Sequence, residues 1–403
     1  MDPAQLARAS FFVLPLFLLG LLVIPGNRWL RVILSVIAAL AVTWLLGTTL
    51  RPGVFTFVAS FSTMAMIYAI LSLGLNSQWG MSGHVNFGIA AFFSVGAFTS
   101  ALVTKTMPEG VLATYSQQAF GLGLPFLVGV LAAGVVSAVL GWLVAIPVLR
   151  LRTDFLAIAT LGIAEIVRLI FQNERWLANG PQPLSSIPKP WNCLANQPQP
   201  CWWEPAWLRD WLSPLTARDY SFVNFLIVAV MLAAVYLLLE RISNSPWGRM
   251  QRAIRDEEQS AAMSGKPVTY YRIQSFVIGS FIMGVGGAIY AHHTTTIDYS
   301  HFMPLYATFI IWVMLMLGGS GNNKGAILGA FIIWAVWSLT DVMIDWMAPA
   351  LRLISNDLPS RGAYLRWMLV AIMLAAIVLY RPQGILKERK RVSDFMPRGR
   401  KGG

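Results

Sequence analysis

The sequence carries little charge for its length, and this scarcity excludes a soluble globular protein. Only 12% of its 403 residues are Asp, Glu, Lys or Arg, whereas 56% are hydrophobic and the mean hydropathy is +0.61. Soluble domains carry about 25% charged residues. Apolar runs long enough to cross a hydrocarbon layer of about 30 Å recur along the chain. They lack the alternation of lipid-facing barrel strands, so the predicted fold class is an all-α polytopic membrane protein.

We expect ten or eleven transmembrane helices, depending on whether the first short apolar run spans the bilayer. The residues after that run lack a small-residue cleavage site, so we expect it to be retained rather than removed as a signal peptide. The candidate spans are residues 11–24, 30–46, 54–75, 85–104, 121–148, 155–172, 222–239, 273–290, 304–318, 325–342 and 363–380.

The motifs of common enzyme classes are missing as well. Gly265-Lys266 lacks the upstream glycine of a phosphate-binding loop, and no HExxH motif occurs. The GGSGN stretch at 318–322 lacks the final glycine of a nucleophile elbow. His292, His293 and His301 flank one predicted loop, for which a solvated loop is a simpler interpretation than a metal site. We therefore expect no enzyme, no ATPase site, no cofactor and no metal in this chain.

The positive charge of the chain is concentrated in a few loops, which predicts their side of the membrane. The tail at 381–403 holds eight basic and two acidic residues, half of the chain's net charge of +12. Further basic residues lie at 245–272 and at Arg150 and Arg152. An even number of spans separates these regions, so we expect them, and the C-terminus, on the cytoplasmic side. The basic excess therefore indicates topology and predicts no nucleic-acid partner.

The longest loop, 174–220, falls on the opposite, external side. It contains the only two cysteines of the chain, Cys193 and Cys201. On an oxidising side of the membrane these form either a disulfide or two free thiols. The loop is also rich in tryptophan, which indicates either an aromatic belt at the membrane surface or a platform for an external partner.

One charged pair is predicted to lie deep in the membrane. Asp154 can cap a helix over 155–171 at its cytoplasmic end. At about 1.5 Å per residue, Glu165 then lies roughly 16 Å into the bilayer, and Arg168 shares its face. Charges at that depth almost always face a bundle interior or a water-filled cavity. The pair either pins helices together or lines a substrate path.

Two glycine-rich stretches, 73–88 and 317–330, interrupt apolar regions in the two halves of the chain. Broken helices in both halves point to a transport site, because their ends offer N–H and C=O groups to a ligand. Each stretch can equally be an ordinary loop. Asn86 is the candidate for the path. Ser280, Gly284 and Ala288, at every fourth residue, indicate close helix packing.

The charged stretch 245–272 predicts two short amphipathic helices on the cytoplasmic side. Ser245 is a good N-cap with Pro246 at the first helical position, and Gly265 fits a C-terminal stop. Such helices either fill a groove in a soluble partner or lie on the lipid, and docking is the interpretation we favour. The candidate docking residues are Trp247, Arg249, Arg252, Arg255, Asp256, Glu257, Glu258 and Gly265.

The block GLNSQWGMSGHVNFGIAAFFSVGAF resembles the signature of the permease subunits of ABC importers for branched-chain and other neutral amino acids, specifically the LivM type. Further matching blocks follow in chain order from LRLRTDFLAIATLGIAEIVRL to NGPQPLSSIP, SPWGRMQRAIRDEEQSAAMSGK, MLGGSGNNKGAILGA and YRPQGIL. The resemblance extends from about Leu71 to Leu386. It implies a multi-pass subunit of the bacterial plasma (inner) membrane that imports branched-chain amino acids.

The resemblance also implies partners. These are a second permease subunit, ATPase subunits that bind ATP at the cytoplasmic face, and an external solute-binding protein. The 245–272 stretch is then the coupling loop, although Gln259-Ser260-Ala261 matches the EAA of the usual coupling motif only loosely. The external loop from Cys193 to Trp211 is long for the family. A urea or amide permease of the same superfamily, a self-sufficient secondary transporter and a channel are the alternatives.

This interpretation divides the chain into three parts. Residues 1–53 are membrane spans outside the strongest resemblance, and residues 54–390 are the permease core. That core includes the external loop 174–220 and the coupling loop 241–272. Residues 391–403 are a basic cytoplasmic tail. We expect partner ATPases to drive alternating access by moving the coupling loop.

Overall fold

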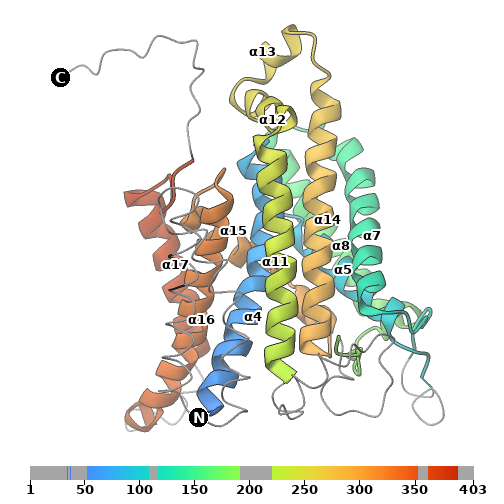
Figure 1. Ribbon diagram of the computed structural model, residues 1–403, viewed down its shortest axis with the longest axis vertical. Coiled ribbons are helices and arrows are strands. Elements are labelled where there is room, and N and C mark those ends of the chain that lie inside the picture. Colours follow the sequence, from blue (N-terminus) through green and yellow to red (C-terminus); the bar gives the residue numbers. More distant parts are fainter. Residues whose placement is uncertain are drawn as a thin grey trace.

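The computed structural model describes residues 52–108, 117–190, 220–352 and 362–388, together with Leu34 and Ile37. The regular structure of these residues is helical, and the predicted all-α membrane fold is confirmed. Figure 1 shows long helices side by side, most of them running along the long axis of the molecule. The predicted span 11–24, nearly all of 30–46, both cysteines and the tail 391–403 lie outside the described residues.

The described helices fall into two groups by length. The long ones are α4 (Pro52–Leu75), α7 (Phe126–Val148), α8 (Thr153–Asn173), α11 (Tyr220–Asn244), α14 (Val268–Thr294), α16 (Asn323–Arg352) and α17 (Gly362–Tyr380). The shorter ones are the π-helix η1 (Asn76–Gly80), α5 (Ile89–Thr104), α9 (Arg175–Ala178), α12 (Pro246–Asp256), α13 (Glu258–Met263), the 3-10 helix η4 (Tyr299–Phe302), the π-helix η5 (Leu305–Phe309) and α15 (Ile310–Gly318).

Five stretches of the described chain are long and apolar enough to cross a membrane: Thr56–Gly80, Phe126–Val148, Tyr220–Asn244, Val268–Thr294 and Asn323–Ile344. Shorter apolar helices cover Ile89–Thr104, Leu305–Gly318 and Tyr364–Tyr380. Each predicted span within the described residues has a corresponding helix, but α7 begins at Phe126 rather than at 121 and α16 extends to Arg352 rather than to 342. Helix α8, which covers the predicted span 155–172, belongs to neither of these two sets of apolar helices.

Three local expectations need correction. The span predicted at 85–104 begins only at Ile89, because residues 81–88 are not helical. The span predicted at 304–318 is divided into η5 and α15. Asp154 does not cap α8: Arg152 occupies the N-cap position, and Asp154 lies in the first turn, where its charge can still favour the positive end of the helix dipole.

Helix α14 lies at the centre of the described bundle and packs most extensively against α7 and α5. Small residues allow this close approach, as the spacing of Ser280, Gly284 and Ala288 predicted. A β-carbon at Gly96 of α5 would lie 2.2 Å from the Gly284 carbonyl oxygen, and one at Gly141 of α7 would lie 2.5 Å from Ser280 Oγ. Close backbone contact of this kind is the main way in which membrane helices associate.

The described parts of the basic regions lie at one end of the bundle, as the charge pattern predicted. Helices α12 and α13 form the top of the view in Figure 1, and residues 381–388 lie at the same end. Phe126, at the start of α7, makes an edge contact with His292 near the other end of α14. The turn after α7, with Arg150 and Arg152, therefore lies at the α12 end.

We expect Gly96→Val to lower the melting temperature of the detergent-purified chain, measured by differential scanning fluorimetry. The added β-carbon must push α5 away from the Gly284 carbonyl of α14, and overpacking of this kind costs about 1–3 kcal/mol. Gly162→Ala on α8 is the matched control, because nothing lies within 4 Å of a β-carbon at that position. An unchanged melting temperature for Gly96→Val would show that α5 and α14 are not in close contact.

Candidate functional site

Between α4 and α5 the chain forms an irregular stretch, residues 76–88, which we call the 76–88 segment. Its first five residues continue α4 as the π-helix η1, and residues 81–88 then lead back to the start of α5 without a regular helix. Its polar side chains Asn76, Ser77, Gln78, Ser82, His84 and Asn86 are all buried. Buried polar groups need internal partners, and those partners define the candidate site.

Asn86 and Gln78 fix the segment to α14 and α15. The Asn86 amide donates to Gln78 Oε1 at 2.7 Å and accepts from the Gly88 N–H at 2.6 Å. Gln78 Nε2 in turn donates to the Phe276 carbonyl of α14 at 2.8 Å. Trp312 Nε1 of α15 donates to the Asn86 carbonyl at 3.0 Å. The side chain of Asn86 is therefore fully buried among protein partners.

A second set of amides joins the two glycine-rich stretches. Asn76 Nδ2 donates to Asn323 Oδ1 at 2.9 Å, and Asn76 Oδ1 accepts from the Gly321 N–H at 2.8 Å. Asn323 Nδ2 donates to the Glu240 carboxylate of α11 at 3.1 Å. Asn76 and Asn323 are 247 residues apart in sequence, so the interruptions in the two halves meet in one network.

The predicted pair of Glu165 and Arg168 forms on α8. Arg168 Nε donates to Glu165 Oε2 at 2.9 Å, and Arg168 Nη1 donates to Gln172 Oε1 at 3.1 Å. The Arg168 guanidinium also lies 5.7 Å from the centre of the Tyr299 ring. The Glu165 side chain is 41% exposed and that of Arg168 is 12% exposed. The Glu165 carboxylate is therefore partly open, although it is paired with Arg168.

The three predicted path residues are not brought together in this structure. Asn86 is enclosed by α14 and α15, whereas the Glu165–Arg168 pair lies toward η4. Thr160 connects α8 to the 76–88 segment, because its Oγ1 accepts from the Phe87 N–H at 3.0 Å.

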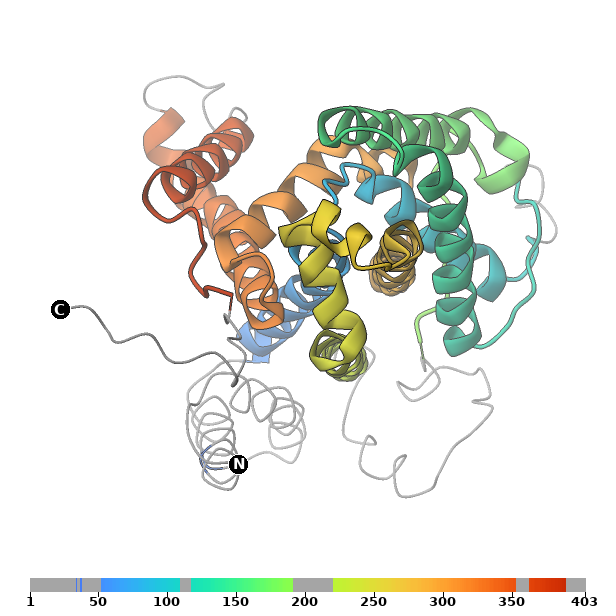
Figure 2. The same ribbon diagram turned by 90° about the horizontal axis from the view of Figure 1, so that it is seen from above.

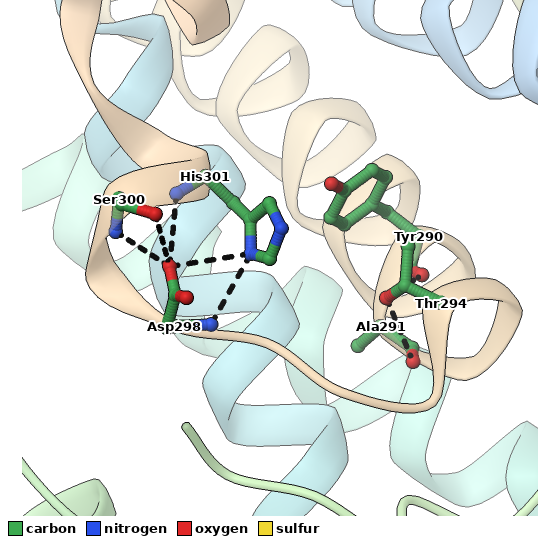
Figure 3. Close-up of polar contacts among 6 residues, drawn as sticks. All are labelled: Tyr290, Ala291, Thr294, Asp298, Ser300 and His301. Carbon is green, nitrogen blue, oxygen red and sulfur yellow. Dashed lines mark hydrogen bonds and ion pairs between the residues drawn. The ribbon is translucent and has the colours of Figure 1, made fainter. Parts of the chain in front are cut away.

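The loop after α14 holds its shape through Asp298, as Figure 3 shows. Asp298 Oδ1 accepts from the Ser300 N–H at 2.8 Å and the His301 N–H at 3.2 Å, and so caps η4. Burial raises the pKa of Asp298, but the hydrogen bonds from Ser300 and the charge of His301 outweigh it and leave the pKa below its usual value. His301 thus serves the cap of a loop.

The other two histidines near this loop also have structural partners. His292 bonds Ser100 Oγ at 2.9 Å and the Pro188 carbonyl at 2.7 Å, and His293 bonds the Asn224 amide at 2.6 Å. Within the described part of the chain, no three His, Cys, Asp or Glu side chains are grouped to hold a metal ion.

The predicted amphipathic helices α12 and α13 form as expected. Ser245 Oγ accepts from the Gly248 N–H at 3.4 Å, Pro246 occupies the first helical position, and Gly265 follows α13 with a φ of 74°. Figure 2 shows both helices, in yellow, over the middle of the described bundle. Their charged side chains Arg249, Asp256, Glu257 and Glu258 are exposed, and Met263 is 86% exposed.

Other predicted docking residues face the protein. Trp247 is partly buried and donates from Nε1 to Gln274 Oε1 of α14 at 2.8 Å. Arg252 donates to the Ser243 carbonyl at 3.1 Å, which ties α12 to the end of α11. These two residues anchor the helices to the bundle.

Two arginines tie α12 and α13 to the 76–88 segment. Arg255 of α12 donates from Nη1 to the Gly80 carbonyl and pairs through Nη2 with Glu388 at 3.0 Å. Arg272, at the start of α14, donates from Nε to His84 Nε2 at 2.7 Å and pairs with Glu258 of α13 at 2.8 Å. A displacement of α12 and α13 must therefore strain the 76–88 segment or break these contacts.

His84 accepts the Arg272 hydrogen bond as a neutral imidazole. Burial, together with the positive charge of Arg272, lowers the pKa of His84 to about 3. Sequence reasoning included Gln78 and His84 in the glycine-rich stretch 73–88 without assigning either a role, and it missed Arg272, Glu240 and Glu388 as parts of this site. The only sequence signal for these residues is that each is a polar residue within or next to an apolar run.

The sequence of this chain matches a known protein family and several of its members. The profile of the family described as "Branched-chain amino acid transport system / permease component" matches residues 57–378. The "High-affinity branched-chain amino acid transport system permease protein LivM" of Salmonella typhimurium is 29% identical over 330 residues, 81% of this chain and 69% of that protein. Its namesake in Escherichia coli is 28% identical over the same length and the same shares. The "Probable branched-chain amino acid transport permease protein LivM" of Methanocaldococcus jannaschii is 27% identical over 356 residues, 82% of this chain and 93% of that protein. No solved structure matches the chain significantly.

We expect His84→Gln to make the stability of the chain less dependent on pH between 7.5 and 5. The unfolded chain binds a proton at His84 near pH 6.5, whereas the folded chain does so only near pH 3. Stability is therefore fully present above pH 6.5 and is lost as the pH falls, by roughly 2 kcal/mol at pH 5. Glutamine keeps an acceptor for Arg272 but cannot be protonated. Melting temperatures of both proteins at the two pH values check this, and equal slopes would contradict it.

Proposed function

From the premise that the chain belongs to the family of branched-chain amino acid transport system permease components, we propose that it forms the membrane path of an ATP-binding-cassette importer for branched-chain or other neutral amino acids. The members of this family are permease subunits and are not themselves enzymes. The observation that carries the proposal is the direct link between the exposed helices α12–α13 and the irregular 76–88 segment inside the bundle. That link connects a surface on which a partner protein can act, α12–α13, to the buried 76–88 segment, whose rearrangement can open a path.

The exposed side of α12 and α13 is the proposed seat of the ATPase subunits. Met263 lies at the end of α13 with 86% of its surface exposed, and exposed charges of both signs lie near it in the sequence, Glu257 and Glu258 before it and Lys266 after it. An apolar side chain within a charged rim fits a groove in a soluble protein better than it fits lipid headgroups. ATP is then bound and hydrolysed by the partner, and this chain needs no cofactor and no ATPase site of its own.

The proposed mechanism is alternating access driven from the α12 end. An ATPase that moves α12 and α13 acts through Arg255 and Arg272 on the Gly80 carbonyl and on His84. The 76–88 segment holds its place through side-chain hydrogen bonds, so it can exchange partners without unwinding a long helix. A zwitterionic substrate needs polar partners for both ends. The 41% exposed Glu165, its partner Arg168, and freed groups such as the Asn86 amide are the proposed partners.

The opposite end of the bundle is the proposed external side. Arg150, Arg152 and the basic helix α12 lie at the α12 end, and basic residues favour the cytoplasmic side of the bacterial inner membrane. The C-terminus is then cytoplasmic, and the 174–220 loop, with Cys193 and Cys201, faces a solute-binding protein. The carboxylate of Glu165 on α8 is partly exposed, and a charged group is unfavourable in lipid. We therefore propose that a second permease subunit packs over it and encloses a water-filled path.

The alternatives are less well supported. The curated relatives described above are branched-chain amino acid permeases by name, which favours amino acids over urea or amides. A channel or a self-sufficient carrier gives no reason for α12 and α13 to be tied by two arginines to the centre of the bundle.

Uptake by the reconstituted complex tests the proposed function. The chain is combined in liposomes with its second permease and ATPase subunits, with ATP enclosed and binding protein plus radiolabelled leucine outside. We expect uptake that requires ATP and that unlabelled isoleucine or valine, but not urea, competes away. Met263→Glu is expected to abolish both uptake and co-purification of the ATPase, because a charge would enter the apolar groove.

Arg150→Gln is the matched control for the docking variant, since Arg150 is an exposed residue at the same end but outside α12 and α13. It should retain uptake and ATPase capture. Leucine uptake by this chain alone, without ATP or partner subunits, would show a carrier or channel instead.

Replacing the proposed path carboxylate should separate transport from assembly. We expect Glu165→Gln to reduce uptake about tenfold or more, while the complex still assembles, because a partner for the substrate ammonium is lost. Glu174→Gln is the control: Glu174 is also exposed, follows the same helix as its C-cap residue, and its carboxylate accepts from Trp176 Nε1 at 2.8 Å.

A second variant guards against simple destabilisation by an unpaired arginine. Glu165→Gln/Arg168→Gln removes both charges, so no buried charge is left without its partner. Normal uptake by this double variant, with a normal melting temperature, would show that the pair within α8 has no role in transport.

A further inference from the structure

Arg255 lies where three distant parts of the chain meet. It belongs to α12, and its guanidinium reaches both the Gly80 carbonyl at the end of η1 and the carboxylate of Glu388 near the C-terminus. The side chains of Arg255 and Glu388 are 23% and 27% exposed, so this pair is more shielded from water than the neighbouring Asp256, which is 70% exposed. Shielding makes an ion pair stronger and more definite in geometry than an exposed one.

The backbone around Glu388 is held firmly against α15. The N–H groups of Ile385 and Leu386 donate to the carbonyls of Leu317 and Gly318 at 2.9 and 3.0 Å. Asn322 Nδ2 adds a bond to the Lys387 carbonyl at 3.2 Å. Residues 384–388, which we call the C-terminal segment, are thereby fixed to the turn between α15 and α16.

Glycines bring these backbones close enough for the side chains to meet. A β-carbon at Gly321, where φ is 78°, would lie 2.8 Å from the Glu388 carboxylate. A β-carbon at Gly83, also with φ of 78°, would lie 3.0 Å from Arg255 Cγ. A larger residue at either position would displace one member of the ion pair, and neither backbone conformation suits a side chain.

The partners of Arg255 differ in how they move with it. Asp256 is its neighbour on the same helix, with Nε to Oδ1 at 3.1 Å, and travels with α12. Gly80 and Glu388 belong to other elements. With Glu388 in place, the planar guanidinium has two fixed points outside α12. Without Glu388, one hydrogen bond to Gly80 remains and the side chain can swing about it toward water.

We propose that Glu388 is a positioning residue for transport: it orients the Arg255 guanidinium so that movement of α12 is delivered to the Gly80 carbonyl and thus to the 76–88 segment. This inference rests on the proposed function. It assigns the C-terminal segment a part in transmitting ATPase motion, separate from the docking surface on α12 and α13. Loss of Glu388 then lets the ATPases turn over while the path fails to respond.

The test uses the complete complex with Glu388→Gln, which keeps the size of the side chain and removes its charge. Three quantities are measured: ATPase co-purification, the rate of ATP hydrolysis, and leucine uptake. We expect normal co-purification, hydrolysis within about twofold of wild type, and uptake per ATP reduced about fivefold. Lys387→Gln is the control, since Lys387 is an exposed charge on the same segment and should keep the wild-type ratio.

A conservative change at the other partner provides a second, independent variant. Arg255→Lys keeps the charge, but an ammonium group lacks the planar fork that reaches Gly80 and Glu388 together. We expect the same fall in uptake per ATP as for Glu388→Gln, with the melting temperature of both variants close to that of wild type.

The possible results separate this inference from the proposed function. Wild-type uptake with an unchanged ratio in Glu388→Gln overturns the positioning role alone. Loss of ATPase capture in Glu388→Gln also overturns it, because Glu388 would then serve docking. Absence of ATP-dependent uptake by the wild-type complex overturns the proposed function and this inference with it.

Discussion

The hydrocarbon layer offers no water to a backbone N–H or C=O group, and the architecture of this chain follows from that constraint. A helix satisfies its own backbone, so an interruption such as the 76–88 segment survives only if the surrounding protein supplies the missing partners. Here the N–H groups of Phe87 and Gly88 donate to side-chain oxygens of Thr160 and Asn86. The carbonyls of Gly80 and Asn86 accept from the guanidinium of Arg255 and the indole of Trp312. The polar network is thus the condition for having a broken helix at all.

The same constraint explains how rigid and adjustable parts are divided. Helices α5, α7 and α14 satisfy their backbones internally and meet through small residues, so they form a close-packed block. The 76–88 segment and the glycine-rich stretch after α15 instead depend on side chains from elsewhere. Parts held by exchangeable side-chain bonds can rearrange at lower cost than a helix, and both arginine links from α12 and α13 end on such a part.

Local features of the fold were predictable from sequence, and long-range ones were not. Apolar runs predicted most of the helices to within five residues at each end, although α16 extends well beyond its predicted end at 342. Ser245 and Gly265 predicted the ends of the α12–α13 unit, and the spacing of Gly284 predicted close packing. These signals act over a few residues. The partner of Asn76 is 247 residues away and that of Arg255 lies near the C-terminus, so no spacing rule could pair them. Asp154 shows the limit even locally, because α8 begins at Thr153, two residues before its expected start, so that Arg152 rather than Asp154 holds the N-cap position.

The close packing of α7 has a consequence for how this sequence can evolve. One face of α7, with Ala133, Ser137 and Gly141, touches α14 and α5, where an added methyl group has no room. The other face exposes Leu131, Val135, Val139 and other apolar residues, which need only remain apolar in lipid. Substitutions should therefore follow the helical period along α7. We expect many of them on the exposed apolar face and few on the face packed against α14 and α5. In α7, the sequence differences between relatives should therefore lie mainly on the face that does not pack against α14 and α5.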